Sequence, residues 1–304
     1  MLNETITLAD LLSATNLSNG IPLNVQMVST IVPYQFYIQL AITVLGSIFV
    51  FFILWGYIKP TIASAIIAIQ FRKLMKQTGR NIMIIKHTAQ GLFSSAYINQ
   101  DTLREVIKGM QKFKGESFDI AILSPGGDVF ASLYISRLIK QYPAEVRAII
   151  PVYAMSGATL LALSCNQIMM NPTSCLGPTD PQLSSFLGGY GSSKAWNDIV
   201  KFKGKRAEDT SISFALMGRQ YTHTISETIN ELIMDKIPNA AKRKKFVQLL
   251  TSGNIEHAKP LTPALLMDYG LPITMIEDKT NVILTKLLNS NLYEGVYAIK
   301  APKE

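Results

Sequence analysis

The sequence of 304 residues is poor in cysteine and histidine. Cys165 and Cys175 are its only cysteines, so it lacks a disulfide framework, and no Cys or His spacing of the metal-binding kind is present. We expect both thiols to be reduced and buried. The three histidines, His87, His223 and His257, leave few candidates for an imidazole base. Because there is also no phosphate-binding loop and no dinucleotide fingerprint, the sequence predicts neither a metal nor a cofactor.

Charged residues are also scarce. They make up 16% of the chain, hydrophobic residues make up 48%, and the mean hydropathy is +0.22. This composition is apolar for a soluble protein and predicts that part of the chain lies in a bilayer. A net charge of +8 is compatible with nucleic-acid binding, but a basic belt beside a membrane segment explains it more simply. We therefore expect membrane lipid, and no nucleic acid, as a partner.

One run of residues is long enough to span a bilayer. Residues 36–58 contain no charged side chain and have aromatic residues near both ends, as transmembrane helices do. A cleaved signal peptide fits poorly, because the run starts late and no basic residue precedes it. Lysine and arginine are absent before the run and frequent from Lys59 on. The positive-inside rule therefore predicts an extracytoplasmic tail (1–35), one helix through the inner (cytoplasmic) membrane (36–58), a basic juxtamembrane helix (59–80) and a cytoplasmic domain.

Residues 81–300 are predicted to form one α/β domain. Short apolar runs alternate with segments of helical periodicity, which is typical of βαβ units on a parallel sheet with functional sites at the carboxyl ends of the strands. Asp101 and Asp128 are the expected N-caps of the first two helices. The expected strands are 81–87, 118–123, 146–152 and 167–170. The expected helices are 101–113, 129–141, 156–164, much of 208–250, and one near 281–288.

Two turns at predicted strand ends carry the most information. Residues 124–127 (Ser-Pro-Gly-Gly) follow the strand at 118–123, and their glycines allow backbone amides to approach a substrate closely. Ser156 lies between the next strand and a helix of small residues. Such a corner can expose a hydroxyl and direct helix-start N–H groups at whatever the hydroxyl attacks, and one amide from each turn would form an oxyanion hole. Taken alone, Ser156 is more simply explained as the N-cap of that helix.

Three blocks of sequence, in this order, resemble one family. They are SPGGDVFASLYISRLIK (124–140), PVYAMSGATLLAL (151–163) and LGPTDPQL (176–183). Together, after a membrane helix and a basic segment, they are similar to the membrane-anchored serine dehydrogenase proteinase family. That family belongs to the ClpP/crotonase superfamily and is related to signal peptide peptidase A and the NfeD-type proteases. The resemblance runs from Arg72 to about Leu183.

The resemblance implies a ClpP-like fold with a serine nucleophile. Ser156 would be that nucleophile, and the N–H groups of Gly127 and Gly157 would form the oxyanion hole. Gly126 would allow substrate to approach the same turn. Asp180 would either bind nearby backbone or shape the substrate groove.

The general base is left open. A serine hydroxyl needs a base, and ClpP-type enzymes place a histidine where this chain has Gly-Pro-Thr-Asp-Pro. Signal peptide peptidase A and NfeD-type relatives use a lysine instead, which works only if its environment keeps it neutral. The corresponding window holds Lys194, Lys201, Lys203 and Lys205, and we favour Lys203 or Lys205. His257 is the alternative if its loop folds over the site.

The predicted function is a membrane-tethered serine peptidase with a Ser-Lys dyad. Its peptide or protein substrate would bind as an extended strand beside Gly126 and Gly127. ClpP-fold proteins commonly assemble, so the resemblance also implies a homo-oligomer. The alternative is an inactive scaffold of the same fold, favoured by the missing histidine and by Ala158, where the family motif has glycine. Crotonase-like acyl-CoA chemistry shares the oxyanion hole but leaves the membrane helix without a role.

Overall fold

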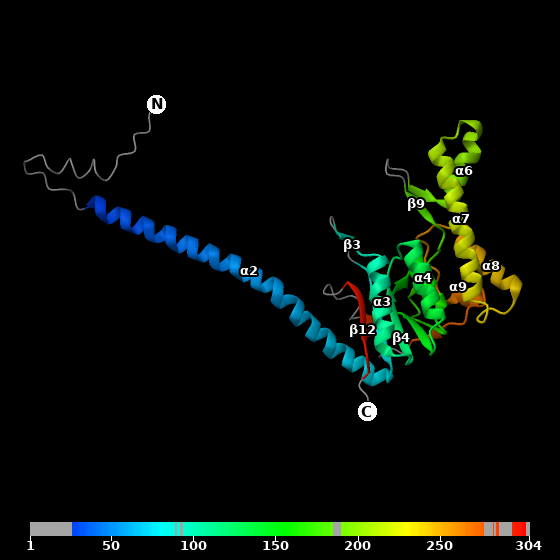
Figure 1. The fold of residues 1–304 in the computed structure, drawn as a ribbon, viewed down its shortest axis with the longest axis horizontal. Coiled ribbons are helices and arrows are strands. Elements are labelled where there is room, and N and C mark those ends of the chain that lie inside the picture. The colour runs from blue at the N-terminus through cyan, green and yellow to red at the C-terminus, as the bar shows by residue number, and fades with distance from the viewer. Residues whose placement is uncertain are drawn as a thin grey trace, which may run out of the picture. The chain divides into compact units, whose positions relative to one another are not determined.

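The first described element is one long helix. The computed structural model describes residues 26–88, 90, 91, 94–184, 190–276, 282, 284, 285 and 294–301 and divides into two units, Met1–Ala63 and Ser64–Glu304. Helix α2, drawn in Figure 1, comprises Gln26–Thr78, and its sequence is apolar over its first half. Among the described helices it alone has a stretch, Tyr34–Gly56, that by length and composition could cross a membrane, with a mean hydropathy of 2.3. This stretch overlaps the predicted span at 36–58.

Two hydroxyls within this apolar stretch bond to carbonyls of the helix itself. The hydroxyl of Thr43 donates to the carbonyl of Gln39 at 2.9 Å, and that of Ser47 donates to the carbonyl of Thr43 at 2.8 Å. Such local bonds leave the hydroxyls without need of water. The helix continues without a break through most of the predicted juxtamembrane segment to Thr78. Residues 1–25 of the predicted tail lie outside the described residues.

The second unit is built on a six-stranded sheet in the order β11-β7-β5-β4-β1-β12. All neighbours are parallel except β12, which runs antiparallel to β1 at one edge. The predicted α/β class with a parallel sheet is therefore confirmed. The strands are β1 (Asn81–Lys86), β4 (Phe118–Leu123), β5 (Val146–Ile150), β7 (Gln167–Met170), β11 (Thr274–Met275) and β12 (Gly295–Ile299).

Helices and three small strand pairs complete this unit. The helices are α3 (Gln100–Phe113), α4 (Val129–Lys140), α5 (Gly157–Ser164), α6 (Ser193–Lys203), the 3₁₀ turn η1 (Gly204–Arg206), α7 (Asp209–Leu232), α8 (Ala240–Thr251) and α9 (Pro263–Asp268). The pairs are β2 (Gln90–Gly91) with β3 (Ser94–Ser95), β6 (Tyr153–Ala154) with β8 (Cys175–Leu176), and β9 (Gln182–Ser184) with β10 (Tyr190–Ser192).

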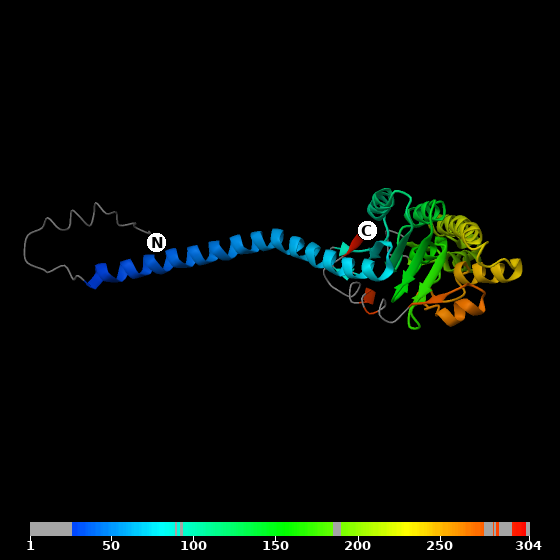
Figure 2. The same cartoon turned by 90° about the horizontal axis from the view of Figure 1, so that it is seen from below.

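The core lies between the sheet and the helices that cover it. Every residue of β1 and β4 is buried, as expected for central parallel strands covered on both faces. Helices α3, α4 and α7 lie along one face of the sheet in Figure 2 and contribute Val106, Ile135 and Ile229 to the core. This apolar packing holds the strand ends in place, and with them the turns that follow the strands.

Most predicted elements are present, with shifts at their ends. Asp128 caps α4 as predicted, its carboxylate accepting from the N–H of Ala131 at 2.8 Å. The predicted cap Asp101 is wrong: Asn99 caps α3, because its side chain accepts from the N–H of Thr102. Strand β12 was not predicted, and most of the helix predicted near 281–288 lies outside the described residues.

The two cysteines are free. Burial raises the pKa of the Cys165 thiol to about 12. Cys175 is only partly buried, so the expectation of two buried thiols is correct for Cys165 alone.

Candidate active site

The two predicted turns lie side by side at the carboxyl edge of the sheet. Strands β4 and β5 are parallel neighbours, so the chain leaves both at the same edge. Ser124 forms a short parallel bridge with Ala154, and the N–H of Met155 donates to the carbonyl of Ser124 at 2.9 Å. This bridge places the Pro-Gly-Gly turn against the corner that holds Ser156.

Close contact between the two turns requires glycine. A Cβ on Gly126 would lie 2.7 Å from Cβ of Ser156 and 2.8 Å from the nitrogen of Gly157. A Cβ on Gly157 would lie 2.2 Å from Oγ of Ser132 on α4. Gly126 also has a φ of +105°, which residues with side chains rarely adopt. Any larger residue would therefore push the turns apart.

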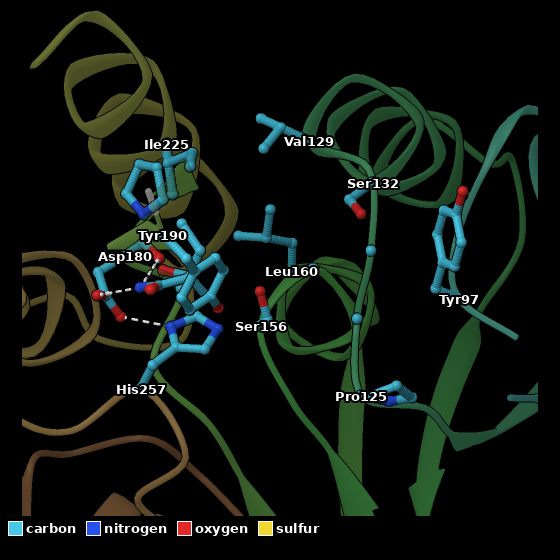
Figure 3. Close-up of a pocket in the computed structure, with 16 residues that line it drawn as sticks. Tyr97, Pro125, Val129, Ser132, Ser156, Leu160, Asp180, Tyr190, Ile225 and His257 are labelled. Carbon is cyan, nitrogen blue, oxygen red and sulfur yellow. Dashed lines mark hydrogen bonds and ion pairs between the residues drawn. The ribbon is translucent and has the colours of Figure 1, made fainter. Parts of the chain in front are cut away.

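Ser156 occupies a strained corner just before α5. Its φ of 49° and ψ of −123° are unusual for a residue with a side chain. The side chain makes no capping hydrogen bond to the described chain, so the N-cap explanation is wrong for its hydroxyl. The corner is held instead by Thr159, whose hydroxyl donates to the carbonyl of Ala154 at 2.8 Å. The Ser156 hydroxyl lies at a cavity (Figure 3).

Two backbone N–H groups beside Ser156 have no acceptor in the described part of the chain, those of Gly127 and Gly157. Ile98 donates its N–H to the carbonyl of Gly126 at 2.8 Å, and its carbonyl accepts the N–H of Asp128 at 2.7 Å. In such a parallel bridge the middle residue, Gly127, turns its own N–H away from Ile98. The nitrogen of Gly127 is 3.5 Å from the Cβ position of Gly157, so the two amides are neighbours.

Asp180 and His257 meet because their loops are joined. Leu176 and Leu261 form an antiparallel bridge, with N–H to carbonyl distances of 3.1 and 2.8 Å. Asp180 follows the first of these residues, and His257 precedes the second. Nδ1 of His257 lies 2.7 Å from Oδ1 of Asp180. Asp180 is 2% exposed, and its Oδ2 accepts from Nε2 of Gln182 at 2.7 Å, so the carboxylate is held from both sides.

One cavity of about 270 Å³ brings these groups together. Ser156 and His257 lie across from each other in Figure 3, with Asp180 behind the imidazole. The apolar side chains of Val129, Leu160 and Ile225, from α4, α5 and α7, line the same cavity, and Leu160 is the nearest of the three to Ser156 in Figure 3. Gly126, Gly127 and Gly157 also line the cavity. The arrangement joins a hydroxyl, an imidazole with a buried carboxylate, and two amides, which are the parts that acyl transfer uses.

The two lysines predicted as bases lie away from this cavity. Lys203 ends α6, is 40% exposed and pairs with Glu208 at 3.1 Å. Lys205 is exposed in η1. Neither lines the cavity around Ser156. The structure therefore separates both lysines from Ser156 and brings the alternative, His257, to it.

Several residues that line the cavity were not predicted from the sequence. Tyr97 and Tyr190 lie at the cavity, and Ile225 reaches it from the middle of α7. No motif marks these positions, because helix and strand patterns do not tell which residue faces a cavity. The sequence contained only a weak signal for the pairing of Asp180 with His257, namely the position of Asp180 in a Pro-rich turn. Among the described residues, no group of three or more His, Cys, Asp or Glu is placed to hold a metal ion.

Comparisons with known proteins agree with the predicted resemblance. The sequence model of the ClpP-like SDH-type serine proteinase family matches residues 36–295. Uncharacterized protein MJ0137 of Methanocaldococcus jannaschii is 30% identical over 195 residues, covering 63% of this chain and 66% of that protein. Uncharacterized protein MJ1495 of the same organism is 29% identical over 217 residues, covering 69% and 70%.

Solved structures similar to this one have lower sequence identity to the chain than these two proteins. A mutant of the 1510-N membrane-bound stomatin-specific protease is 18% identical with a TM-score of 0.44, covering 61% of this chain and 78% of that chain. ClpP1 from Listeria monocytogenes is 18% identical with a TM-score of 0.40, covering 65% and 91%. The family match spans most of the sequence, from the apolar stretch of α2 almost to the end of the described sheet. This chain therefore belongs to the ClpP-like SDH-type serine proteinase family.

Proposed function

We propose that this protein is a membrane-tethered peptidase with a Ser156–His257–Asp180 triad. The observation that carries the proposal is the meeting of the Ser156 hydroxyl and the His257–Asp180 pair at one cavity. The apolar stretch of α2 supports the tether. Contact with membrane lipid and assembly into a homo-oligomer belong to the same proposal.

The proposed reaction is acyl transfer from a peptide to serine. Oγ of Ser156 attacks the scissile carbonyl and gives its proton to Nε2 of His257. Asp180 holds the Nδ1–H, which keeps Nε2 available as the acceptor and stabilises the imidazolium. The imidazolium then donates its proton to the leaving amine, the C–N bond breaks, and an acyl-enzyme remains. Water, deprotonated by His257, then attacks the acyl group. The ester bond to Oγ breaks, the imidazolium returns its proton to Oγ, and the acid is released.

The negative oxygen of the tetrahedral state would be held by two amides. The N–H groups of Gly127 and Gly157 are adjacent and have no acceptor in the described chain, so an incoming oxygen would satisfy both. Substrate would lie as an extended strand along Gly126 and Gly127. The apolar side chains that line the cavity, Val129, Leu160 and Ile225, would receive a side chain of the substrate.

His257 replaces a lysine as the proposed base for a geometric reason. The imidazole is already fixed by a buried carboxylate at the cavity, whereas Lys203 pairs with Glu208, Lys205 is exposed, and neither lines the cavity. No hydrogen bond joins Ser156 to His257 in the described contacts, and catalytic bonds are often long until substrate binds. The proposal therefore rests on shared location and on the fixed His257–Asp180 pair.

The test is covalent labelling of the full chain in detergent with a fluorophosphonate probe. We expect labelling of the wild type and none of Ser156→Ala. His257→Ala and Asp180→Asn should label at least about 100-fold more slowly, as triad variants do. Lys203→Ala, Lys205→Ala and the exposed His223→Ala should stay within about 2-fold of the wild type, because single surface changes have small effects.

Two results would contradict the proposal. A lysine variant that loses labelling while His257→Ala keeps it would assign the base to that lysine. A folded wild type that takes no probe at all would favour the inactive scaffold.

A further inference from the structure

A buried histidine outside the cavity is bonded to the turn that carries Gly127. His87 follows β1 directly and is 5% exposed. Its Nδ1 lies 3.2 Å from Oγ of Ser124, and its Nε2 lies 3.4 Å from Oγ1 of Thr102. Ser124 and Thr102 are buried as well. The imidazole thus joins the end of β4 to the first turn of α3, two segments that the triad does not use.

The Thr102 hydroxyl lies 3.2 Å from Oδ1 of Asn99 and 3.4 Å from Nε2 of His87, and it has one proton to donate. We assign that proton to the shorter bond, to Asn99, which places the proton of His87 on Nε2. Burial lowers the pKa of His87 to about 4, so the ring is neutral at neutral pH and Nδ1 is an acceptor. The Ser124 hydroxyl then donates to Nδ1 and accepts the N–H of Gly126 at 3.2 Å.

This chain of bonds braces both sides of the bridge that orients Gly127. On one side, Asn99 follows Ile98, the residue that bonds the carbonyl of Gly126. On the other side, Ser124 receives the N–H of Gly126 itself. Gly126 and Gly127 have φ values of +105° and +153°, and they lack side chains that could lock the turn. Their conformation therefore depends on such external hydrogen bonds.

We propose that His87 is a positioning residue that holds the Gly126–Gly127 turn so that the Gly127 N–H faces the cavity next to that of Gly157. The inference rests on the proposed function, because the Gly127 N–H matters only if it stabilises an oxyanion. His87 touches neither substrate nor Ser156. It acts through Ser124 and Thr102, and its loss would misdirect one of two oxyanion donors.

The test compares His87→Leu with the matched control His223→Leu in the full chain in detergent. His223 is exposed on α7 and does not line the cavity of Ser156. Fluorophosphonate labelling is followed to completion at several probe concentrations, which separates the maximal rate from the half-saturating concentration and from the final labelled fraction. Hydrogen exchange of peptides covering residues 124–128 is measured on the same samples and needs no catalysis.

We expect His87→Leu to lower the maximal labelling rate about 10- to 100-fold, since removing one oxyanion donor costs about 10²- to 10³-fold. The half-saturating concentration and the final fraction should stay unchanged, whereas general unfolding would lower the fraction. Exchange at 124–128 should rise, while exchange at 157–164 stays as in the wild type. His87→Asn, whose amide oxygen can accept from Ser124 near the position of Nδ1, should recover most of the rate. His223→Leu should change neither readout.

Failure of this inference is distinct from failure of the proposed function. A folded His87→Leu protein with wild-type rate, or with wild-type exchange at 124–128, overturns the role of His87. A lower labelled fraction at an unchanged rate also overturns it. If His87→Leu does not fold, Ser124→Ala cuts the same chain of bonds and should give the same loss of rate and the same rise in exchange. Absence of Ser156-dependent labelling in the wild type refutes the triad. In that case the hydrogen exchange of residues 124–128 is the measurement that tests whether His87 holds the turn.

Discussion

At the scale of single residues, the site depends on backbone conformations that side chains disfavour. Ser156 has a positive φ, although it has a Cβ. Such a conformation persists only when the surroundings impose it, here the Thr159 hydroxyl and the bridge from Ser124 to Ala154. In this conformation the Ser156 hydroxyl makes no capping bond to α5 and lies at the cavity.

This strain predicts an order of stability among inactive variants. Ser156→Gly and Ser156→Ala both lack the hydroxyl, but only glycine tolerates the positive φ without strain. Relief of about 1–3 kcal/mol, partly offset by about 1 kcal/mol of added chain entropy in the unfolded state, leaves Ser156→Gly more stable by about 1 kcal/mol. Denaturant unfolding of the two full-length variants in detergent measures the difference. Equal stability would show that the corner is not strained.

At the scale of elements, the start of α3 is determined by the residue that caps it. The sequence analysis predicted Asp101 as the N-cap of this helix. The structure uses Asn99, which forms a reciprocal capping box with Thr102. Asp101 lies two residues further along the chain, is exposed and pairs with Arg104. Local sequence could not separate the two, because both residue types are good caps.

The two candidates provide a matched pair of variants. Asn99→Ala should lower the free energy of unfolding by about 1 kcal/mol, because the N–H of Thr102 loses its acceptor. Asp101→Ala should change it by less than about 0.5 kcal/mol, since an exposed ion pair contributes little. Thermal unfolding followed by circular dichroism compares them. A larger loss in Asp101→Ala than in Asn99→Ala would contradict the assigned cap.

At the scale of the whole molecule, the charge flanking the apolar stretch determines the expected topology. Residues 1–36 contain no Lys or Arg, whereas Lys59, Arg72, Lys73 and Lys76 follow the stretch. The family match begins at residue 36, so it includes this stretch. We expect the N-terminus outside and the catalytic unit in the cytoplasm.

Reporter fusions in a bacterial host test this topology. A fluorescent protein fused to the C-terminus should fluoresce, and alkaline phosphatase at the same position should be inactive, because the phosphatase needs an oxidising compartment. Replacing Lys59, Arg72 and Lys73 with glutamine should raise phosphatase activity, since the charge bias is then weaker. An active phosphatase on the unaltered chain would reverse the predicted orientation.

Much of the fold follows from local pattern. Apolar runs and helical periodicity predicted β4 and β7 at their observed bounds, and α4 with its Asp128 cap, because these features depend on residues within a few positions of each other. The glycine turns could also be predicted from the sequence, since tolerance of a positive φ and the lack of a Cβ are properties of glycine itself. Strand β12 was not, because an edge strand of intermediate burial has little apolar pattern and is defined by its pairing with the distant β1.

The composition of the candidate site was decided by tertiary structure. The sequence by itself predicted Ser156, the two glycine turns and the apolar stretch, since each has a local signal. It left the base open, because His257 and Asp180 are 77 positions apart and nothing local links them. The bridge between Leu176 and Leu261 brings their loops together. The same holds for His87, whose contact with Ser124 exists only because β1 and β4 end side by side.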